Sequence, residues 1–377
     1  MTRALAAVGV AVVLALGSVL PAAASGLIRV AVVDNARAVE VRGTDLEVAA
    51  LDACPRCGSP PRRAAVVRAT VGGDGVEVNG IRAGGFRLRS QHPLRLNGRD
   101  YPSPLDILKH GEGLVVVNEV PLEEYLVGVV RAEAGEKWPL EALRAQAIVA
   151  RTYAAYHRTL SAAKPYHLLA STAHQQYAGR VPAASPIWGA VGETAGQVLL
   201  WEGDVFPAFY HTESGGYTED PRTVFAARNM PGLKPVRCEF STGSPHFYWA
   251  LDVRLTDLTE ILRRHDIVLG TVTAIDITER TPSLRAAVVT VHGGRGSARL
   301  RGNDFRRMIG YDTFKSTLFA VAVDSQWARF SGRGYGHGVG MCQWGAKGMA
   351  EQGHSARQIL EFYYPGAVLS TLDRVGR

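Results

Sequence analysis

The chain has 377 residues, of which 46% are hydrophobic and 20% charged, and its formal net charge is +7. These proportions are ordinary for globular proteins and exclude a wholly disordered or fibrous chain. The basic excess is spread as single or paired arginines, whereas nucleic-acid-binding proteins concentrate it on one stripe, so we expect no nucleic-acid partner. The length predicts two domains, or one large domain with insertions.

The first two dozen residues have the pattern of an export signal. Arg3 precedes an uncharged apolar run from Ala4 to Leu20, and Ala22-Ala23-Ala24 provides an A-x-A cleavage motif before Ser25. We therefore expect residues 1–24 to be a signal peptide and the protein to be exported to the periplasm or cell envelope. Cleavage predicts a mature chain that begins near Ser25, and retention of the segment as an anchor is the alternative.

The remaining sequence predicts an α+β fold. Short alternating apolar runs between turns predict a β-rich N-terminal domain over residues 25–100. Helical and strand patterns then mix, which predicts a second, α+β domain over residues 101–370. Its expected elements are helices at 122–133 and 139–157, strands within 197–211 and 250–300, a helix at 258–264, a strand at 327–340, and helices at 346–351 and 355–364.

The four cysteines are compatible with an exported protein. Cys54 and Cys57 form a C-P-R-C motif, and Cys238 and Cys342 stand apart from it. In an oxidising compartment an even number of cysteines favours disulfides. A zinc ribbon needs a second C-x-x-C motif, which the sequence lacks. We interpret C-P-R-C as a local disulfide or a pair of thiols.

Glu133 stands at the end of an apolar helical stripe. Leu122, Leu126, Val129 and Val130 repeat at helical spacing, and the series continues to Glu133. A carboxyl group among apolar neighbours has a raised pKa and can act as a general acid on a glycosidic oxygen. The alternative is a structural Glu133 that faces solvent or pairs with Arg151, which falls on the inward side of the next helix.

The segment HTESGGYTE, residues 211–219, follows an apolar run and places polar groups next to paired glycines. Such glycines let the backbone approach a ligand closely. His211 and Ser214 are therefore candidate ligand-binding residues. A serine nucleophile is disfavoured because the G-x-S-x-G turn is missing.

The segment GRGYGHGVG, residues 332–340, has glycine at every second position. This spacing predicts a strand with one bare face, and its other face would present Arg333, Tyr335 and His337 to sugar carboxylates and hydroxyls. A tightly packed glycine strand is the alternative. A dinucleotide site is improbable because no βαβ unit follows. Cys342, five residues after His337, also raises a cysteine-peptidase alternative, or it belongs to a packed turn.

Three segments together resemble the SpoIID/LytB family. They are VVNEVPLEEYLVGVVRAEAGEKWPLEALRAQAIVARTYA, HTESGGYTE, and GRGYGHGVGMCQWGAKGMAEQG with ILEFYYPGA. They occur in family order from about residue 101 to 369. The resemblance implies a SpoIID-like catalytic domain acting on peptidoglycan, either as a lytic transglycosylase of peptide-stripped glycan strands or as an enhancer of a cell-wall N-acetylmuramoyl-L-alanine amidase.

The resemblance also implies roles for individual residues. The family's catalytic acid falls on Glu133 and its essential arginine on Arg151, for which we expect contact with a substrate carboxylate. Residues expected to line the substrate groove are His211, Ser214, Arg333, Tyr335, His337 and Gln343.

Two features depart from the family pattern. Glu213 adds a carboxylate to the middle motif and is the next candidate acid. Some sporulation members carry a zinc site, but here only His167 and His174 remain, without cysteines. We therefore expect no metal and no cofactor.

Overall fold

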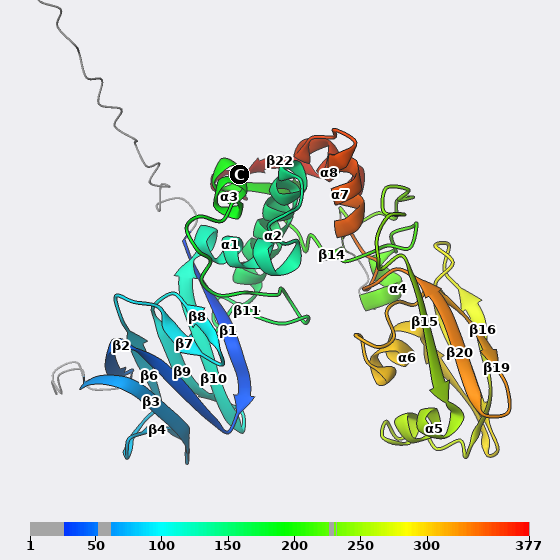
Figure 1. Ribbon diagram of the computed structural model, residues 1–377, viewed down its shortest axis with the longest axis horizontal. Coiled ribbons are helices and arrows are strands. Elements are labelled where there is room, and N and C mark those ends of the chain that lie inside the picture. The colour runs from blue at the N-terminus through cyan, green and yellow to red at the C-terminus, as the bar shows by residue number, and fades with distance from the viewer. Residues whose placement is uncertain (1–25, 52–61, 226–229, 231, 377) are drawn as a thin grey trace, which may run out of the picture.

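The computed structural model describes residues 26–51, 62–225, 230 and 232–376. The expected signal peptide and the Cys54–Cys57 motif lie outside the described residues. Within these ranges, no helix is long and apolar enough to cross a membrane. The chain forms two lobes joined by a group of helices (Figure 1). The α+β fold expected from the sequence is confirmed.

A mixed sheet makes up the first lobe, in the order β11-β1-β10-β9-β6-β2-β3-β4-β5, with β7 and β8 attached beside β2. Its strands are β1 (Leu27–Ala36), β2 (Ala38–Ala50), β3 (Arg62–Gly72), β4 (Gly75–Val78), β5 (Ile81–Ala83), β6 (Gly85–Arg89), β7 (Leu94–Leu96), β8 (Arg99–Tyr101), β9 (Leu105–His110), β10 (Gly113–Pro121) and β11 (Leu168–Leu169). The sheet runs across residue 100, where the sequence suggested a domain boundary.

Helix α1 (Leu122–Glu133) and helix α2 (Leu140–Leu160) follow directly from the sheet. Both confirm the helical periodicity of the sequence. Leu126 and Val130 of α1 pack into the same core as the sheet residues. Pro139 precedes the first residue of α2, where its missing N–H costs no hydrogen bond.

Helix α2 separates two hydrophobic cores. Leu143 and Ala147 belong to the core shared with the sheet, and Ile148 and Val149 belong to a second core. Elements around these cores are α3 (Ile187–Glu193), β12 (Gln197–Trp201), β13 (Asp204–Val205), β14 (Tyr210–His211), α4 (Pro221–Phe225), β21 (Met341–Cys342), α7 (Gln343–Glu351), α8 (Ala356–Tyr363), β22 (Val368–Thr371) and a terminal 3₁₀ turn (Leu372–Arg374).

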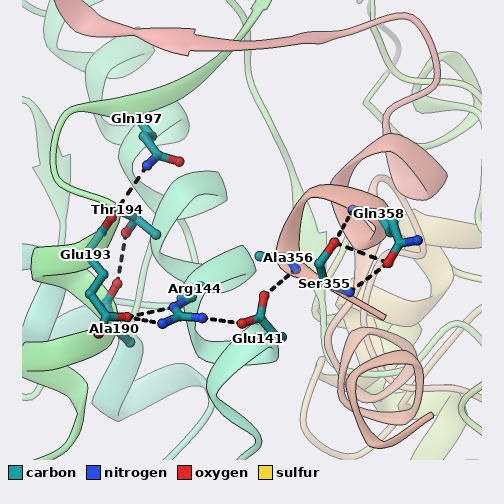
Figure 2. Close-up of polar contacts among 9 residues, drawn as sticks. All are labelled: Glu141, Arg144, Ala190, Glu193, Thr194, Gln197, Ser355, Ala356 and Gln358. Carbon is teal, nitrogen blue, oxygen red and sulfur yellow. Dashed lines mark hydrogen bonds and ion pairs between the residues drawn. The ribbon is translucent and has the colours of Figure 1, made fainter. Parts of the chain in front are cut away.

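Polar contacts fix the start of α2 against its neighbours, as Figure 2 shows. Arg144 lies between the carboxylates of Glu141 and Glu193 and pairs with both, which joins α2 to the end of α3. The backbone N–H of Ala356 donates to Glu141 over 2.7 Å, while Ser355 caps the same helix, α8. The first turn of α2 thereby holds both α3 and α8.

The second lobe has its own core. Its strands are β15 (Tyr248–Arg254), β16 (Val272–Arg280), β17 (Ala286–Gly293), β18 (Gly296–Arg301), β19 (Phe319–Val323) and β20 (Trp327–Arg333), with helices α5 (Leu255–Arg263) and α6 (Gly302–Ile309). They form two three-stranded sheets, β15-β20-β19 and β16-β17-β18. Buried side chains such as Phe305, Phe314 and Phe330 form the core of this lobe.

The glycine-rich segment corrects one sequence-based expectation. Strand β20 ends at Arg333, and residues 334–340 form a loop instead of continuing the strand. Gly334, Gly336, Gly338 and Gly340 all adopt positive φ angles, from 70° to 114°, which extended strands do not use. The alternating glycines therefore allow a tightly folded loop, not a strand with one bare face.

Candidate active site

Glu133 is the last residue of α1, and three donors surround its carboxylate. The backbone N–H of Gln176 donates to Oε1 over 2.8 Å, and the Tyr210 hydroxyl donates to the same oxygen over 3.3 Å. The side-chain amide of Gln343 donates to Oε2 over 3.2 Å. Glu133 as a whole residue keeps partial contact with solvent, although its carboxyl group is largely removed from water.

The surroundings of Glu133 favour its protonated form. Removal of the carboxyl from bulk water raises its pKa above the usual range, and the hydrogen bonds from Gln176, Gln343 and Tyr210 offset only part of this rise. A carboxyl group with a raised pKa, on a residue that keeps some contact with solvent, is suited to general acid catalysis.

Further hydrogen bonds hold Tyr210 in place. Gln175 donates to the Tyr210 hydroxyl over 3.1 Å and accepts from the Tyr125 hydroxyl over 3.2 Å. Tyr125 and Gln175 are fully buried. Tyr210, one of the three donors to Glu133, is thus fixed by buried groups that cannot turn freely, as a preorganised site requires.

Gln343 is the expected ligand-binding residue that the structure brings to Glu133. It is the first residue of α7, and its amide nitrogen also lies 3.5 Å from the side-chain oxygen of Gln146. Gln343 contacts the carboxylate of Glu133. Because its side chain is almost completely buried, it has little surface left for contact with a ligand.

Arg151 lies away from Glu133, near the other end of α1, and this corrects our expectation that it contacts the substrate. Its guanidinium is completely buried and forms a bidentate ion pair with Glu123, over 2.9 and 2.6 Å. It also donates to the carbonyls of Gln197 and Val191. Glu123 and Glu133 are ten residues apart on α1, or about 15 Å along the helix axis. Arg151 therefore fixes the far end of α1 and does not touch Glu133.

His211 and His337 lie side by side, with ring centroids 5.6 Å apart. His211 Nδ1 donates to the carbonyl of Val339 over 3.1 Å, and the Val339 N–H donates to His337 Nδ1 over 3.0 Å. Burial, with Arg306 and Arg285 nearby, lowers the pKa of His337 to about 3, and burial also lowers the pKa of His211. Both imidazoles are therefore neutral at physiological pH.

Ser214 and Glu213 are completely buried and support the backbone. The Ser214 hydroxyl accepts from the N–H of Gly216 over 3.3 Å. Glu213 accepts from the N–H of Gly215 over 2.9 Å and from the Ser241 hydroxyl over 2.7 Å. Neither side chain is placed to contact a substrate, so their roles as a binding residue and as a second acid are not supported by this geometry.

Arg333 and Tyr335 do not share one face with His337. Arg333 stands opposite Tyr248 in the strand register, and both line an open hollow of about 530 Å³ on the second lobe. The Tyr335 hydroxyl donates to Asp312 over 2.9 Å. Arg333, Tyr335 and His337 therefore have three different environments and do not form one binding face.

Cys342 has the environment of a structural thiol. Its sulfur accepts from the N–H groups of Ser214, over 3.2 Å, and Gly345, over 3.3 Å, at the start of α7. Burial raises its pKa well above the ordinary value, which disfavours the thiolate that a cysteine nucleophile needs. The packed turn, one of the sequence alternatives, describes this residue better than a cysteine peptidase does.

No group of three or more His, Cys, Asp or Glu side chains in the described ranges could hold a metal ion. His167 hydrogen-bonds with Arg29, and the His174 ring packs against the His157 ring at 4.8 Å. The expected absence of zinc stays a prediction.

The sequence-based prediction gave no role in the site to Tyr210, Gln175 or Gln176. Tyr210 directly precedes His211 at the end of the apolar run, so its position was a usable signal. Gln175 and Gln176 lie in a segment without regular secondary structure, and no periodicity marks them.

Comparison with known proteins shows which family this chain resembles. Residues 110–201 match the family model described as stage II sporulation protein, SpoIID. Stage II sporulation protein D of Bacillus amyloliquefaciens is 31% identical over 293 residues, which cover 72% of this chain and 80% of that protein. The chain belongs to the SpoIID family. The resemblance expected from the three motifs is thereby confirmed.

This SpoIID protein is also similar to two further proteins and to a second family model. An uncharacterized protein of Brachyspira hyodysenteriae is 30% identical over 308 residues, 80% of this chain and 82% of that protein. The amidase enhancer of Bacillus subtilis is 31% identical over 294 residues, 65% of this chain but only 40% of that protein. Residues 238–340, most of the second lobe, match a domain of unknown function, DUF8618.

Proposed function

We propose that this SpoIID protein is an exported lytic transglycosylase that cleaves peptide-stripped peptidoglycan glycan strands. The observation that carries the proposal is Glu133, a partly exposed residue whose carboxyl group has a raised pKa and is held by three donors. A glycosidase acid must be protonated before it reacts and must be reached by the substrate. The raised pKa of Glu133 and the partial exposure of the residue support both requirements.

The hydrogen bonds indicate which carboxyl oxygen carries the proton. Oε1 accepts from two donors, the Gln176 N–H and the Tyr210 hydroxyl, whereas Oε2 accepts only from Gln343. Because two donors already occupy Oε1, we infer that the proton resides on Oε2. Oε2 is therefore the oxygen that faces the glycosidic bond in this mechanism.

A single carboxyl group can perform both steps of the reaction. Glu133 gives its proton to the bridging oxygen as the bond between this oxygen and C1 of the sugar breaks. The 6-hydroxyl oxygen of the same sugar then bonds to C1, and its proton returns to the Glu133 carboxylate. The products are a free hydroxyl end and a 1,6-anhydro end, and no water is consumed, so no second carboxylate is needed.

The second candidate function is activation of a cell-wall amidase without glycan cleavage. The similarity to the Bacillus subtilis amidase enhancer supports it. In that case Glu133 would be part of a binding surface, and its protonation would not matter for a chemical step.

Replacement of Glu133 by Gln separates the two functions. Gln has nearly the same size and can hydrogen-bond, but it can neither donate nor accept the catalytic proton. We expect Glu133→Gln to fold normally and to lose 1,6-anhydro product by about 10²–10⁴-fold. The measurement is mass spectrometry of products from sacculi with and without prior amidase treatment.

Glu136→Gln is the matched control. Glu136 is exposed and pairs with Arg131 over 3.4 Å, three residues beyond Glu133, so the variant should retain activity. The enzyme proposal fails if the wild type makes no anhydro ends while it and Glu133→Gln stimulate an amidase equally. Persistent anhydro product in Glu133→Gln would instead exclude Glu133 as the acid.

A further inference from the structure

Four aromatic side chains form a row that links the two lobes. The ring centroid of Trp138 lies 5.5 Å from that of Trp344. The Trp344 ring lies 6.2 Å from the His246 ring, and the His246 ring lies 5.5 Å from the Tyr335 ring. We name these four residues the aromatic track.

The track begins at the candidate active site. Trp138 follows Glu133 by five residues, in the short connection between α1 and α2. Trp344 directly follows Gln343, whose amide donates to Glu133. His246 and Tyr335 lie within the stretch matched to the domain of unknown function, so the track leads from the catalytic carboxyl onto the second lobe.

Trp138 packs against the first core and Trp344 against the second, and the track continues from them along partly exposed side chains. All four side chains are partly exposed. Within the described ranges, no ring contact joins Trp138 to His246 or to Tyr335, so the rings follow one another instead of clustering. Partly exposed rings in a row can offer apolar surface to a ligand.

Backbone hydrogen bonds hold the row in place. Glu213 and Tyr335 exchange N–H to carbonyl bonds of 2.9 and 2.8 Å. The N–H of Trp344 donates to the carbonyl of Thr212 over 3.1 Å. The middle motif of the family therefore anchors two of the four rings, which reduces the ordering cost when a ligand binds.

Positive charge accompanies the rings. The Lys315 ammonium lies 4.3 Å from the Tyr335 ring centroid and the Lys347 ammonium 5.2 Å from the Trp344 ring centroid. Lys347 is paired with Glu351, whereas Lys315 forms no ion pair among the residues described here. Lys315 is therefore the cation that remains available to an anionic ligand.

We propose that the aromatic track binds the glycan strand on one side of the cleavage point, so that the 238–340 region supplies part of the substrate-binding surface. The C–H groups on a sugar face carry slight positive charge and stack on the negative face of an aromatic ring. In a strand without peptide stems the lactyl groups end in carboxylates, which Lys315 attracts. The inference rests on the proposed function, since it places the cleavage point at Glu133.

Binding to Glu133→Gln protein tests the track without consuming the ligand. The probes are a fluorescent peptide-stripped glycan strand and a neutral chito-oligosaccharide of the same length. We expect Tyr335→Ala and His246→Ala, each added to Glu133→Gln, to weaken binding of both probes about tenfold. Tyr335→Phe keeps the ring and should keep the affinity. Lys315→Ala should weaken binding of the carboxylate-bearing strand alone.

Trp327→Ala is the matched control. Trp327 stacks with Arg254 at 4.9 Å, but it begins β20, whereas Tyr335 lies just beyond the end of that strand. Its loss should leave binding unchanged, and a thermal unfolding curve checks that each variant folds. Unchanged affinity in Tyr335→Ala and His246→Ala would overturn the proposal, as would an equal loss in Trp327→Ala.

The two proposals fail in distinguishable ways. If the wild type yields no anhydro ends but the track variants lose affinity, the enzyme proposal is wrong and glycan binding by the track stands. If the wild type forms anhydro ends and the track variants bind the peptide-stripped glycan strand as tightly as Glu133→Gln does, the proposal of glycan binding by the track is wrong and the enzyme proposal stands.

Discussion

At the scale of single residues, the position of Glu133 costs folding energy when the group is ionised. Removal from water raises the pKa of its carboxyl in the folded protein above the value in the unfolded chain. The protonated form is thus the one that the fold favours. The contribution of Glu133 to stability is present below the unfolded pKa and is lost as the pH rises through the folded pKa.

This linkage gives the first prediction. Glu133→Gln cannot ionise, so it should unfold with the same free energy as the wild type below about pH 4 and become the more stable protein above it. Urea unfolding of both proteins across this pH range measures the difference. A difference that is constant with pH, or that favours the wild type at neutral pH, would contradict the raised pKa.

The same pKa shift predicts the pH dependence of cleavage. Only the protonated Glu133 can donate to the glycosidic oxygen, so the rate of anhydro-end formation should fall as the pH rises through the raised pKa. The rate is measured with peptide-stripped glycan at saturating and subsaturating concentrations. A rate that increases steadily with pH across this range would mean that a carboxylate, not a carboxylic acid, limits the reaction.

At the scale of elements, the pair formed by Arg151 and Glu123 joins α2 to the first turn of α1. Removing one partner of a buried ion pair leaves the other charge without compensation. We expect Arg151→Ala to lower the free energy of unfolding by about 3–5 kcal/mol. Arg131→Ala, which breaks an exposed pair with Glu136, should cost less than about 1 kcal/mol.

Unchanged stability together with weaker glycan binding would contradict this assignment. If Arg151→Ala unfolded like the wild type but bound carboxylate-bearing glycan more weakly, Arg151 would contact the substrate, as we expected from the sequence. Chemical denaturation and glycan binding on the same preparation distinguish the two roles.

The glycine loop before α7 gives a second prediction at this scale. Gly340 has a φ of 70°, and a Cβ there would lie 2.0 Å from the carbonyl oxygen of Phe209. Because that neighbour is backbone, Gly340→Ala should destabilise the protein by about 3 kcal/mol or more. Gly353 also has a positive φ but nothing within 4 Å of a Cβ, so Gly353→Ala should cost only about 1 kcal/mol. Equal losses in thermal unfolding would contradict the steric argument.

At the scale of the whole molecule, the features set by local pattern were predictable and those set by packing were not. The apolar repeat predicted α1 and placed Glu133 at its end, because helical periodicity is a property of neighbouring residues. The partner of Arg151 was not predictable, since Glu123 lies 28 residues away and meets it only when α1 packs on α2. Alternating glycines fit both a strand and a loop, and only contacts such as that of Gly340 with Phe209 decide between them.

Besides the aromatic track, buried polar contacts join the two lobes, and each lobe has its own apolar core. The Glu219 carboxylate accepts from the hydroxyls of Thr281 and Ser283, both over 2.6 Å. The buried Arg285 guanidinium donates to the carbonyl of Ser214 over 2.5 Å, and burial lowers its pKa to about 10. A few buried hydrogen bonds therefore connect the family's middle motif to the second lobe.

Loss of these polar contacts should destabilise the second lobe more than the first. Arg285→Met removes the donor to Ser214 and leaves buried acceptors unpaired, so we expect a loss of about 3 kcal/mol. Hydrogen exchange should accelerate first in β16 and β17, while β1 and β10 keep their protection, because the apolar contacts of the first lobe are untouched. Arg299→Ala, which removes an exposed pair with Glu279 on the same lobe, should change exchange little. Equal acceleration of hydrogen exchange in all four strands would mean that the lobes unfold as one unit. No acceleration of exchange in β16 and β17 would mean that the polar contacts between the lobes do not stabilise the second lobe.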